Sequence, residues 1–182
     1  MAAIIRPLAI MLGLLAFTCM ASANAADDYW QKHHCTRSLP EPALVKKGVK
    51  GHTFKIIKKR GEALETATIG GEKITIIHFG CEGAGWQIRT RIKDADKNAT
   101  ASGVYDRARS LLKTIKPSAT ELPGLTEAIS VIDSYTAPAR GTPALSERLV
   151  AVHGEFETSV SVSTAAEGAD TWLTIMIYTG PT

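Results

Sequence analysis

The chain has 182 residues, of which 45% are hydrophobic and 21% are charged, a composition typical of a folded domain rather than a disordered segment. Its 21 Lys and Arg against 18 Asp and Glu give a net charge of +3, which is too small to favour a nucleic-acid partner or a dedicated binder of anionic membranes. The sequence shows no internal repeat or low-complexity tract, so repeat and fibrous architectures are excluded.

Residues 1–25 are predicted to be a secretory signal peptide. Arg6 precedes an apolar run over 8–20 that is too short to cross a bilayer, and the small residues Ala23 and Ala25 mark a signal-peptidase site. No later apolar run is long enough for a membrane span. We therefore expect residues 26–182 to form a single domain that is periplasmic or secreted.

Removal of this leader would also remove Cys19 and leave Cys35 and Cys81. An even number of cysteines in an oxidising compartment predicts a disulfide. In the chain-entropy model, closing a loop of this length stabilises the fold by at most about 4 kcal/mol. The bond would join the polar segment 27–37 to the end of a strand and so order it.

Four consecutive segments after the first cysteine have strand character. The ranges 53–59, 63–69 and 73–79 are rich in Ile and Thr and are separated by glycine-containing turns at 60–61 and 70–71. The clearest strand follows, because apolar and polar residues alternate there: Trp86, Ile88, Thr90 and Ile92 against Gln87, Arg89, Arg91 and Lys93. Together these segments predict an antiparallel meander that buries one face.

The hydrophobic period then changes from that of a strand to that of a helix. A first helix is predicted from the spacing of Val104, Ala108, Leu111, Leu112 and Ile115, and Pro117 ends it. A second helix is predicted from Leu122, Leu125, Ala128, Ile129 and Ile132, with Pro123 in its first turn.

The segments 150–164 and 171–179 return to strand composition, with Gly168 in the turn between them. Because the first of these is long for a strand, we expect a β-bulge at His153 and Gly154. Strands followed by helices and then by strands predict an α+β fold. We expect an antiparallel sheet of about six strands, made of a four-strand meander and two later strands, with both helices packed on one face and the opposite face in water.

The sequence contains no recognisable catalytic set. A nucleophile-elbow motif is absent, and Ser110 with Lys113 lacks the other elements of a serine–lysine acylase. The carboxylates Glu62, Glu65, Glu72 and Glu82 are residue types used in glycoside cleavage, but their spacing favours solvated side chains at strand edges. We predict no catalytic residue from the sequence.

A metal site is a sharper alternative. His33, His34 and Cys35 are of zinc- or copper-ligating type and would meet His78 and Cys81 if the two segments are neighbours. A disulfide would consume both sulfurs, and no spacing for four ligands is present. We therefore predict no metal and no cofactor, and keep a metal-binding role for the histidines as an alternative.

One short motif resembles a known family. Ser102, Gly103, Val104 and Tyr105 are similar to the S-G-x-Y motif of periplasmic inhibitors of invertebrate-type lysozyme. In that family, which is β-rich, the motif lies on an exposed loop and its Ser and Tyr enter the lysozyme cleft. The other interpretation is the start of a helix, with Ser102 near the cap and Tyr105 half-buried.

Three functional classes follow from these observations. The favoured one is a non-catalytic exported binding protein, an inhibitor or immunity protein that acts on a toxin or a cell-wall enzyme. Its partner would be another protein, and the candidate contact residues are Arg89, Arg91 and Lys93, which suit an acidic partner, together with Ser102 and Tyr105. The alternatives are a small periplasmic hydrolase assembled only by the fold, and a metal-binding protein that uses His33, His34 and His78.

Overall fold

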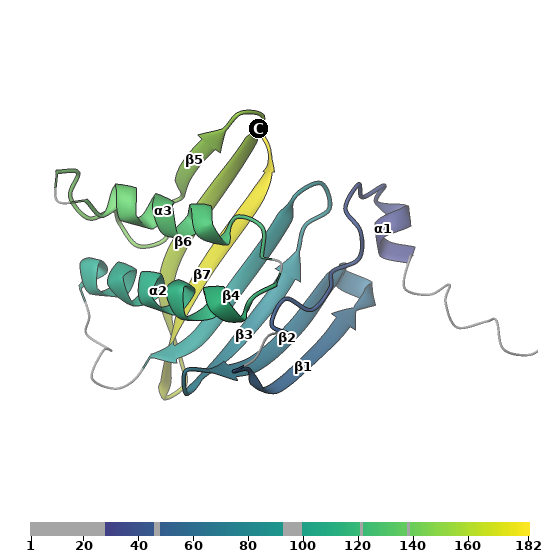
Figure 1. Cartoon of the computed structure of the whole chain (residues 1–182), viewed down its shortest axis with the longest axis horizontal. Coiled ribbons are helices and arrows are strands. Elements are labelled where there is room, and N and C mark those ends of the chain that lie inside the picture. The colour runs from purple at the N-terminus through teal and green to yellow at the C-terminus, as the bar shows by residue number, and fades with distance from the viewer. Residues whose placement is uncertain (1–27, 46–47, 93–99, 121, 138) are drawn as a thin grey trace, which may run out of the picture.

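Seven antiparallel strands form one sheet in the computed structural model, which describes residues 28–182 except 46–47, 93–99, 121 and 138. The sheet order is β1-β2-β3-β4-β7-β6-β5 (Figure 1). The strands are β1 (Lys50–Ile57), β2 (Glu62–Ile69), β3 (Glu72–Phe79), β4 (Ala84–Ile92), β5 (Leu149–His153), β6 (Phe156–Glu167) and β7 (Asp170–Pro181). The helices are α1 (Asp28–Lys32), α2 (Ala101–Ile115) and α3 (Leu125–Tyr135), with short 3-10 turns η1 (Lys58–Arg60) and η3 (Lys116–Ser118). The α+β fold expected from the sequence is confirmed.

The alternation of residue types explains the two faces of the sheet. In β4, Trp86, Ile88 and Ile92 are buried on the side of the sheet that carries the helices, whereas Arg91 is exposed on the opposite side. We call the helix-covered side the inner face and the other the outer face. The four-strand meander predicted over the first half is confirmed by the pairing of β1 with β2, β2 with β3 and β3 with β4.

The sheet has one strand more than expected. The long segment at 150–164 is not a bulged strand but two strands, since β5 and β6 pair from Leu149–Val160 to His153–Phe156. Gly154 has a φ of 65°, which suits the first position of a two-residue hairpin turn. The sheet has seven strands instead of about six because the turn at Gly154 was not recognised in the sequence.

Helices α2 and α3 lie together on the inner face over β5, β6 and β7 (Figure 1). The apolar stripe predicted for the first helix is buried: Val104, Tyr105, Ala108, Leu111, Leu112 and Ile115. Helix α2 begins after Thr100, whose hydroxyl accepts a hydrogen bond from the Gly103 N–H, so the cap lies two residues before Ser102. Helix α3 begins after Gly124, which has a φ of 79°; the expectation that Pro123 lies inside its first turn was wrong.

The inner face beside β2 and β3 is covered by irregular chain. Residues 37–45, which we call the strap, follow α1 and include the fully buried Ala43 and Leu44. The Ala43 carbonyl accepts hydrogen bonds from the backbone N–H and the hydroxyl of Thr120, in the α2–α3 connection. The strap therefore links the meander to the helical layer.

Candidate functional site

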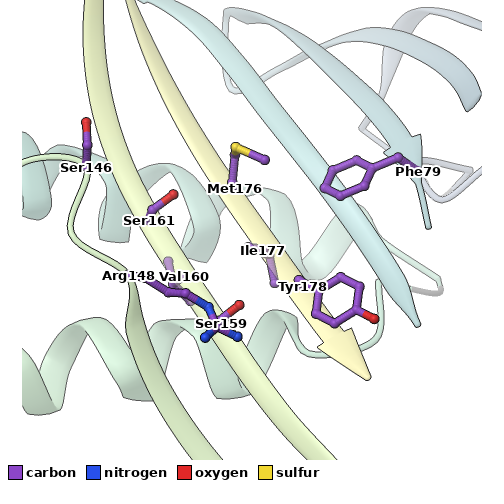
Figure 2. A pocket seen from close by; sticks show the side chains of 9 residues that line it. All are labelled: Phe79, Ser146, Arg148, Ser159, Val160, Ser161, Met176, Ile177 and Tyr178. Atoms are coloured by element: carbon purple, nitrogen blue, oxygen red, sulfur yellow. The ribbon is translucent and has the colours of Figure 1, made fainter. Parts of the chain in front are cut away.

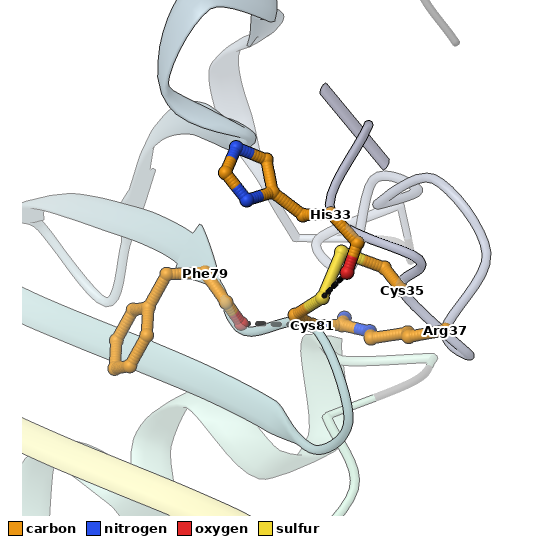
Figure 3. Close-up of a disulfide and its surroundings, with 5 residues drawn as sticks. All are labelled: His33, Cys35, Arg37, Phe79 and Cys81. Carbon is orange, nitrogen blue, oxygen red and sulfur yellow. Dashed lines mark hydrogen bonds between the residues drawn. A yellow bond between two sulfur atoms is a disulfide. The ribbon is translucent and has the colours of Figure 1, made fainter. Parts of the chain in front are cut away.

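The disulfide predicted between Cys35 and Cys81 is present and joins the chain just before the strap to the β3–β4 turn (Figure 3). Its sulfurs are 2.05 Å apart, and 46 residues separate the two cysteines. The Arg37 N–H donates to the Cys81 carbonyl at 3.1 Å, so a backbone hydrogen bond continues the covalent link. The bond joins the N-terminal segment to the chain after β3, as the position of the cysteines in the sequence predicted.

Arg37 adds a further contact at the same place. Its guanidinium donates to the Phe79 carbonyl at 2.9 Å and lies 5.7 Å from the centre of the Trp86 ring (Figure 3 shows the first contact). Desolvation by burial lowers the pKa of Arg37 from its ordinary value. The beginning of the strap is thus held by a disulfide, a hydrogen bond and a cation–π contact.

The middle of the strap is held by a buried carboxylate. Glu65 of β2 is fully buried, and its two oxygens accept hydrogen bonds from four donors. One oxygen accepts from the Leu44 N–H at 2.8 Å and from His52 Nε2 at 2.7 Å. The other accepts from the Ala43 N–H at 3.1 Å and from His78 Nε2 at 2.8 Å. We call Glu65, His52 and His78 the Glu65 cluster.

Opposing effects set the protonation of Glu65. Burial alone raises the pKa of a carboxyl group, but the hydrogen bonds from His78, Leu44, Ala43 and His52 together more than offset it, so the Glu65 pKa lies below its ordinary value. The cluster therefore favours the ionised carboxylate. Its four donors satisfy a charge that would otherwise be costly to bury.

The expectation that Glu65 is a solvated strand-edge residue was wrong. The signal was present in the alternation, because Glu65 shares its side of β2 with Ala63, Ala67 and Ile69. His78 likewise shares the inner side of β3 with Ile74 and Ile76. An acidic residue and a histidine on buried sides of neighbouring strands indicate a buried pair.

The structure does not bring the proposed metal-ligand histidines together. His33 and His34 are exposed, whereas His78 is buried and bonded to Glu65. Cys35 and Cys81 are consumed by the disulfide. In the part of the chain that the structure describes, no group of three His, Cys, Asp or Glu side chains is arranged to hold a metal ion.

The basic residues of β4 reach the outer side, as predicted, but acidic residues already pair with them. Arg89 bonds to Glu167 at 2.5 Å and lies 5.0 Å from the centre of the Trp172 ring. Arg91 bonds to Asp170 at 2.7 Å. Both acids belong to the β6–β7 hairpin, so these cations tie neighbouring strands together. Lys93 lies outside the described residues.

The S-G-x-Y residues lie in the first turn of α2 and not on a loop. Ser102 is exposed, but Tyr105 is fully buried, and its hydroxyl donates to the Ala144 carbonyl at 3.0 Å. Burial, with a smaller effect of Glu147, raises the pKa of Tyr105. In this conformation Tyr105 cannot enter the cleft of a partner, so the fold favours the helix-start interpretation.

A shallow groove of about 310 Å³ lies on the outer face, away from the helices (Figure 2). Phe79, Met176 and Tyr178 project from the sheet there (Figure 2). The remaining lining residues are Ser146, Arg148, Ser159, Val160, Ser161 and Ile177. These side chains offer aromatic and hydroxyl contacts, and Arg148 is paired with Glu157.

A glycine gives the groove its aromatic wall. Gly85 lies between Phe79 and Tyr178 in the strand register. A Cβ at Gly85 would come within 2.3 Å of the Phe79 ring, so that ring rests on the bare backbone. In the strand register, Tyr178 pairs with Ser159 of β6, and Ser159 pairs with Val150 of β5. These outer-face residues connect the groove to the β5 edge of the sheet.

The β5–β6 hairpin tip, residues 152–156, ends this edge. All five of its residues are exposed, and Val152 and Phe156 retain 61% and 57% of their surface. In Figure 1 the hairpin extends past both helices, next to the C-terminus. Sequence analysis missed this site because residues 150–164 were interpreted as one strand with a bulge at His153 and Gly154.

Comparisons with models of known protein families, with curated proteins and with solved structures find no match to this chain. Within the described residues, no helix combines the length and the apolar character needed to cross a bilayer.

Proposed function

We propose that this protein is an exported, non-catalytic binding protein that holds a protein partner through its β5–β6 hairpin tip. The observation that carries the proposal is the exposure of Val152 and Phe156, two of the four large apolar side chains exposed among the described residues. Val152 pairs with Glu157 and lies on the outer face, whereas Phe156 lies on the helix-covered side, so the projecting hairpin exposes one large apolar side chain on each face. Exposed apolar side chains on a projecting segment are typical of interaction sites, where an aromatic residue anchors the contact. The partner would offer an apolar cleft that receives Phe156.

The support beneath the tip favours such a role. Thr182 donates to the Glu155 carbonyl through both its N–H and its hydroxyl, at 3.0 and 3.3 Å. Strands β6 and β7 pair along their whole length, from Phe156–Pro181 to Glu167–Asp170. A hairpin held in one conformation loses little conformational entropy when it binds.

The disulfide supports an exported protein, because such bonds persist in oxidising compartments. A small disulfide-bonded domain that presents an aromatic residue on a rigid turn suits a protein that blocks a cleft. An inhibitor or immunity protein for a toxin or a cell-wall enzyme is therefore the class that we favour.

Capture from periplasmic extract, followed by binding measurements with the purified partner, tests the proposal. We expect the double variant Val152→Ser, Phe156→Ser to bind about 30-fold or more weakly, which corresponds to about 2 kcal/mol. The matched control is Val45→Ser, since Val45 is 55% exposed on the strap and should not matter. Unchanged binding of the double variant would contradict the proposal, and loss of binding in Arg89→Glu, Arg91→Glu alone would move the site to the outer side of β4.

A further inference from the structure

The Glu65 cluster holds the strap through contacts that all depend on one ionisable group. The N–H groups of Ala43 and Leu44 both donate to the Glu65 carboxylate, each to a different oxygen. A carboxylate accepts at both oxygens, whereas a protonated carboxyl group has one O–H that donates. Protonation would therefore place an O–H donor at one of the two oxygens, where it would face an N–H group that needs an acceptor.

Among the described residues, no other acidic side chain lies beside Glu65 to replace its charge. The titratable side chains facing it are His52 from β1 and His78 from β3, both of which donate to it. The strap contributes backbone N–H groups there, and residues 42–45 have no ionisable side chain. On β2 itself, the neighbours that share its side are Ala63 and Ala67.

The strap also has fixed ends. The disulfide holds the chain at Cys35, and β1 begins at Lys50 in pairing with Thr68 of β2. Residues 37–45 can therefore leave the sheet without unthreading any element. Local opening of this kind costs less free energy than global unfolding.

We propose that the strap is a proton-operated latch. With Glu65 ionised the strap is locked on the inner face, and proton uptake by Glu65 lifts residues 43–44 off β2 while the disulfide keeps the chain tethered. The opening reaches the helical layer as well, because the Thr120 N–H donates to the Ala43 carbonyl at 2.8 Å and loses that acceptor when the strap lifts. This device is independent of the hairpin tip.

Amide hydrogen exchange of the oxidised protein, measured by NMR and corrected for intrinsic rates, tests the latch. The reporters are the amides of Ala43, Leu44 and Thr120, and the reference is the set of core amides in β3 and β4. Between about pH 6.5 and about pH 3 we expect protection at the reporters to fall by about tenfold, with less than about a twofold change in the reference.

Variants separate the latch from a general acid effect. In Glu65→Gln the reporters should exchange fast at both pH values, whereas Glu62→Gln, on the outer side of the same strand, should behave like the unmodified protein. If Glu65→Gln does not fold, His52→Ala is used instead, because His52 is partly exposed and its replacement removes one donor to Glu65. In this variant the reporter amides should lose protection at a higher pH than in the unmodified protein. Protection that persists at acid pH, or that is lost equally in the β3 and β4 reference, would overturn the proposal.

Discussion

The two edge strands of the sheet, β1 and β5, differ in charge and in the regularity of their pairing. At the β1 edge, the charged side chains Lys50 and Lys55 are exposed and the strand register is irregular between Lys50 and Thr53. At the β5 edge, the sequence Leu-Val-Ala-Val-His has no Lys, Arg, Asp or Glu, and its hairpin exposes Val152 and Phe156. Charges and irregularities on an edge strand discourage pairing with another chain, and their absence permits contact.

The contacts that hold the N-terminal segment and the strap are also found on only one side of the sheet. The disulfide, Arg37 and the Glu65 cluster all act on the β1–β3 side, where the strap covers part of the inner face and α2 reaches β3 through the Arg107–Glu72 ion pair. On the β5 side, two helices supply the core and leave the tip bare. The difference suggests that one end of the molecule provides stability and the other provides contact, which can be tested by measuring both properties in the same variants.

The largest loss of stability should come from the disulfide. Replacement of Cys35 and Cys81 by serine removes a link across 46 residues. We expect the free energy of unfolding to fall by about 2–4 kcal/mol in urea titration, because the unfolded chain regains its freedom. A fall below about 0.5 kcal/mol would show that the N-terminal region contributes little to the stability of the fold.

The second largest loss should come from Glu65→Gln. An amide in place of the carboxylate faces two of the four donors with its own N–H group, at an expected cost of about 3 kcal/mol. The conservative control is Glu62→Gln, with an expected change within about 0.5 kcal/mol.

The same variant should change the acid dependence of stability. Because the Glu65 pKa is lowered by folding, its contribution is complete above the ordinary Glu pKa of about 4.3 and is lost as the pH falls toward the folded value. The unmodified protein should therefore lose more stability than Glu65→Gln between about pH 6 and about pH 3, measured by denaturant titration at each pH. Parallel curves for the two proteins would show that Glu65 titrates alike in the folded and unfolded states.

A smaller loss is expected from Tyr105→Phe. The variant removes the hydrogen bond to Ala144 but keeps the buried ring, so the free energy of unfolding should fall by about 1 kcal/mol. Partner binding should not change. Weaker binding with unchanged stability would instead support the role that the S-G-x-Y resemblance implies.

The smallest effect on stability should come from the tip. In the double variant Val152→Ser, Phe156→Ser, both side chains are more than half exposed, so the unfolding free energy should change by no more than about 0.5 kcal/mol. Its binding loss should nevertheless be the largest of the series. Strong destabilisation would show that the tip is part of the fold and not a contact site.

Much of the architecture could be predicted because alternation and helical spacing are local properties. Four strands, both long helices and the disulfide were predicted from such signals and are confirmed. The Gly154 turn was missed because strand-like residues stand on both sides of it, so composition alone does not show where the chain reverses.

The sites were harder to predict because they depend on what packs against a residue. Nothing near Glu65 in the sequence shows that residues 43–44 cross β2, and nothing near Arg89 shows that Glu167 will pair with it. These contacts join residues far apart in the chain. The exposure of Phe156 is likewise visible only once the helices are seen to end before the hairpin tip.

The division between a fastened end and a binding end is tested most directly by hydrogen exchange of the oxidised protein with and without its purified partner. We predict that partner binding slows exchange across residues 149–156 and leaves β1 and the strap unchanged. Slowed exchange at β1 or on the outer side of β4, with none at the hairpin tip, would contradict the account.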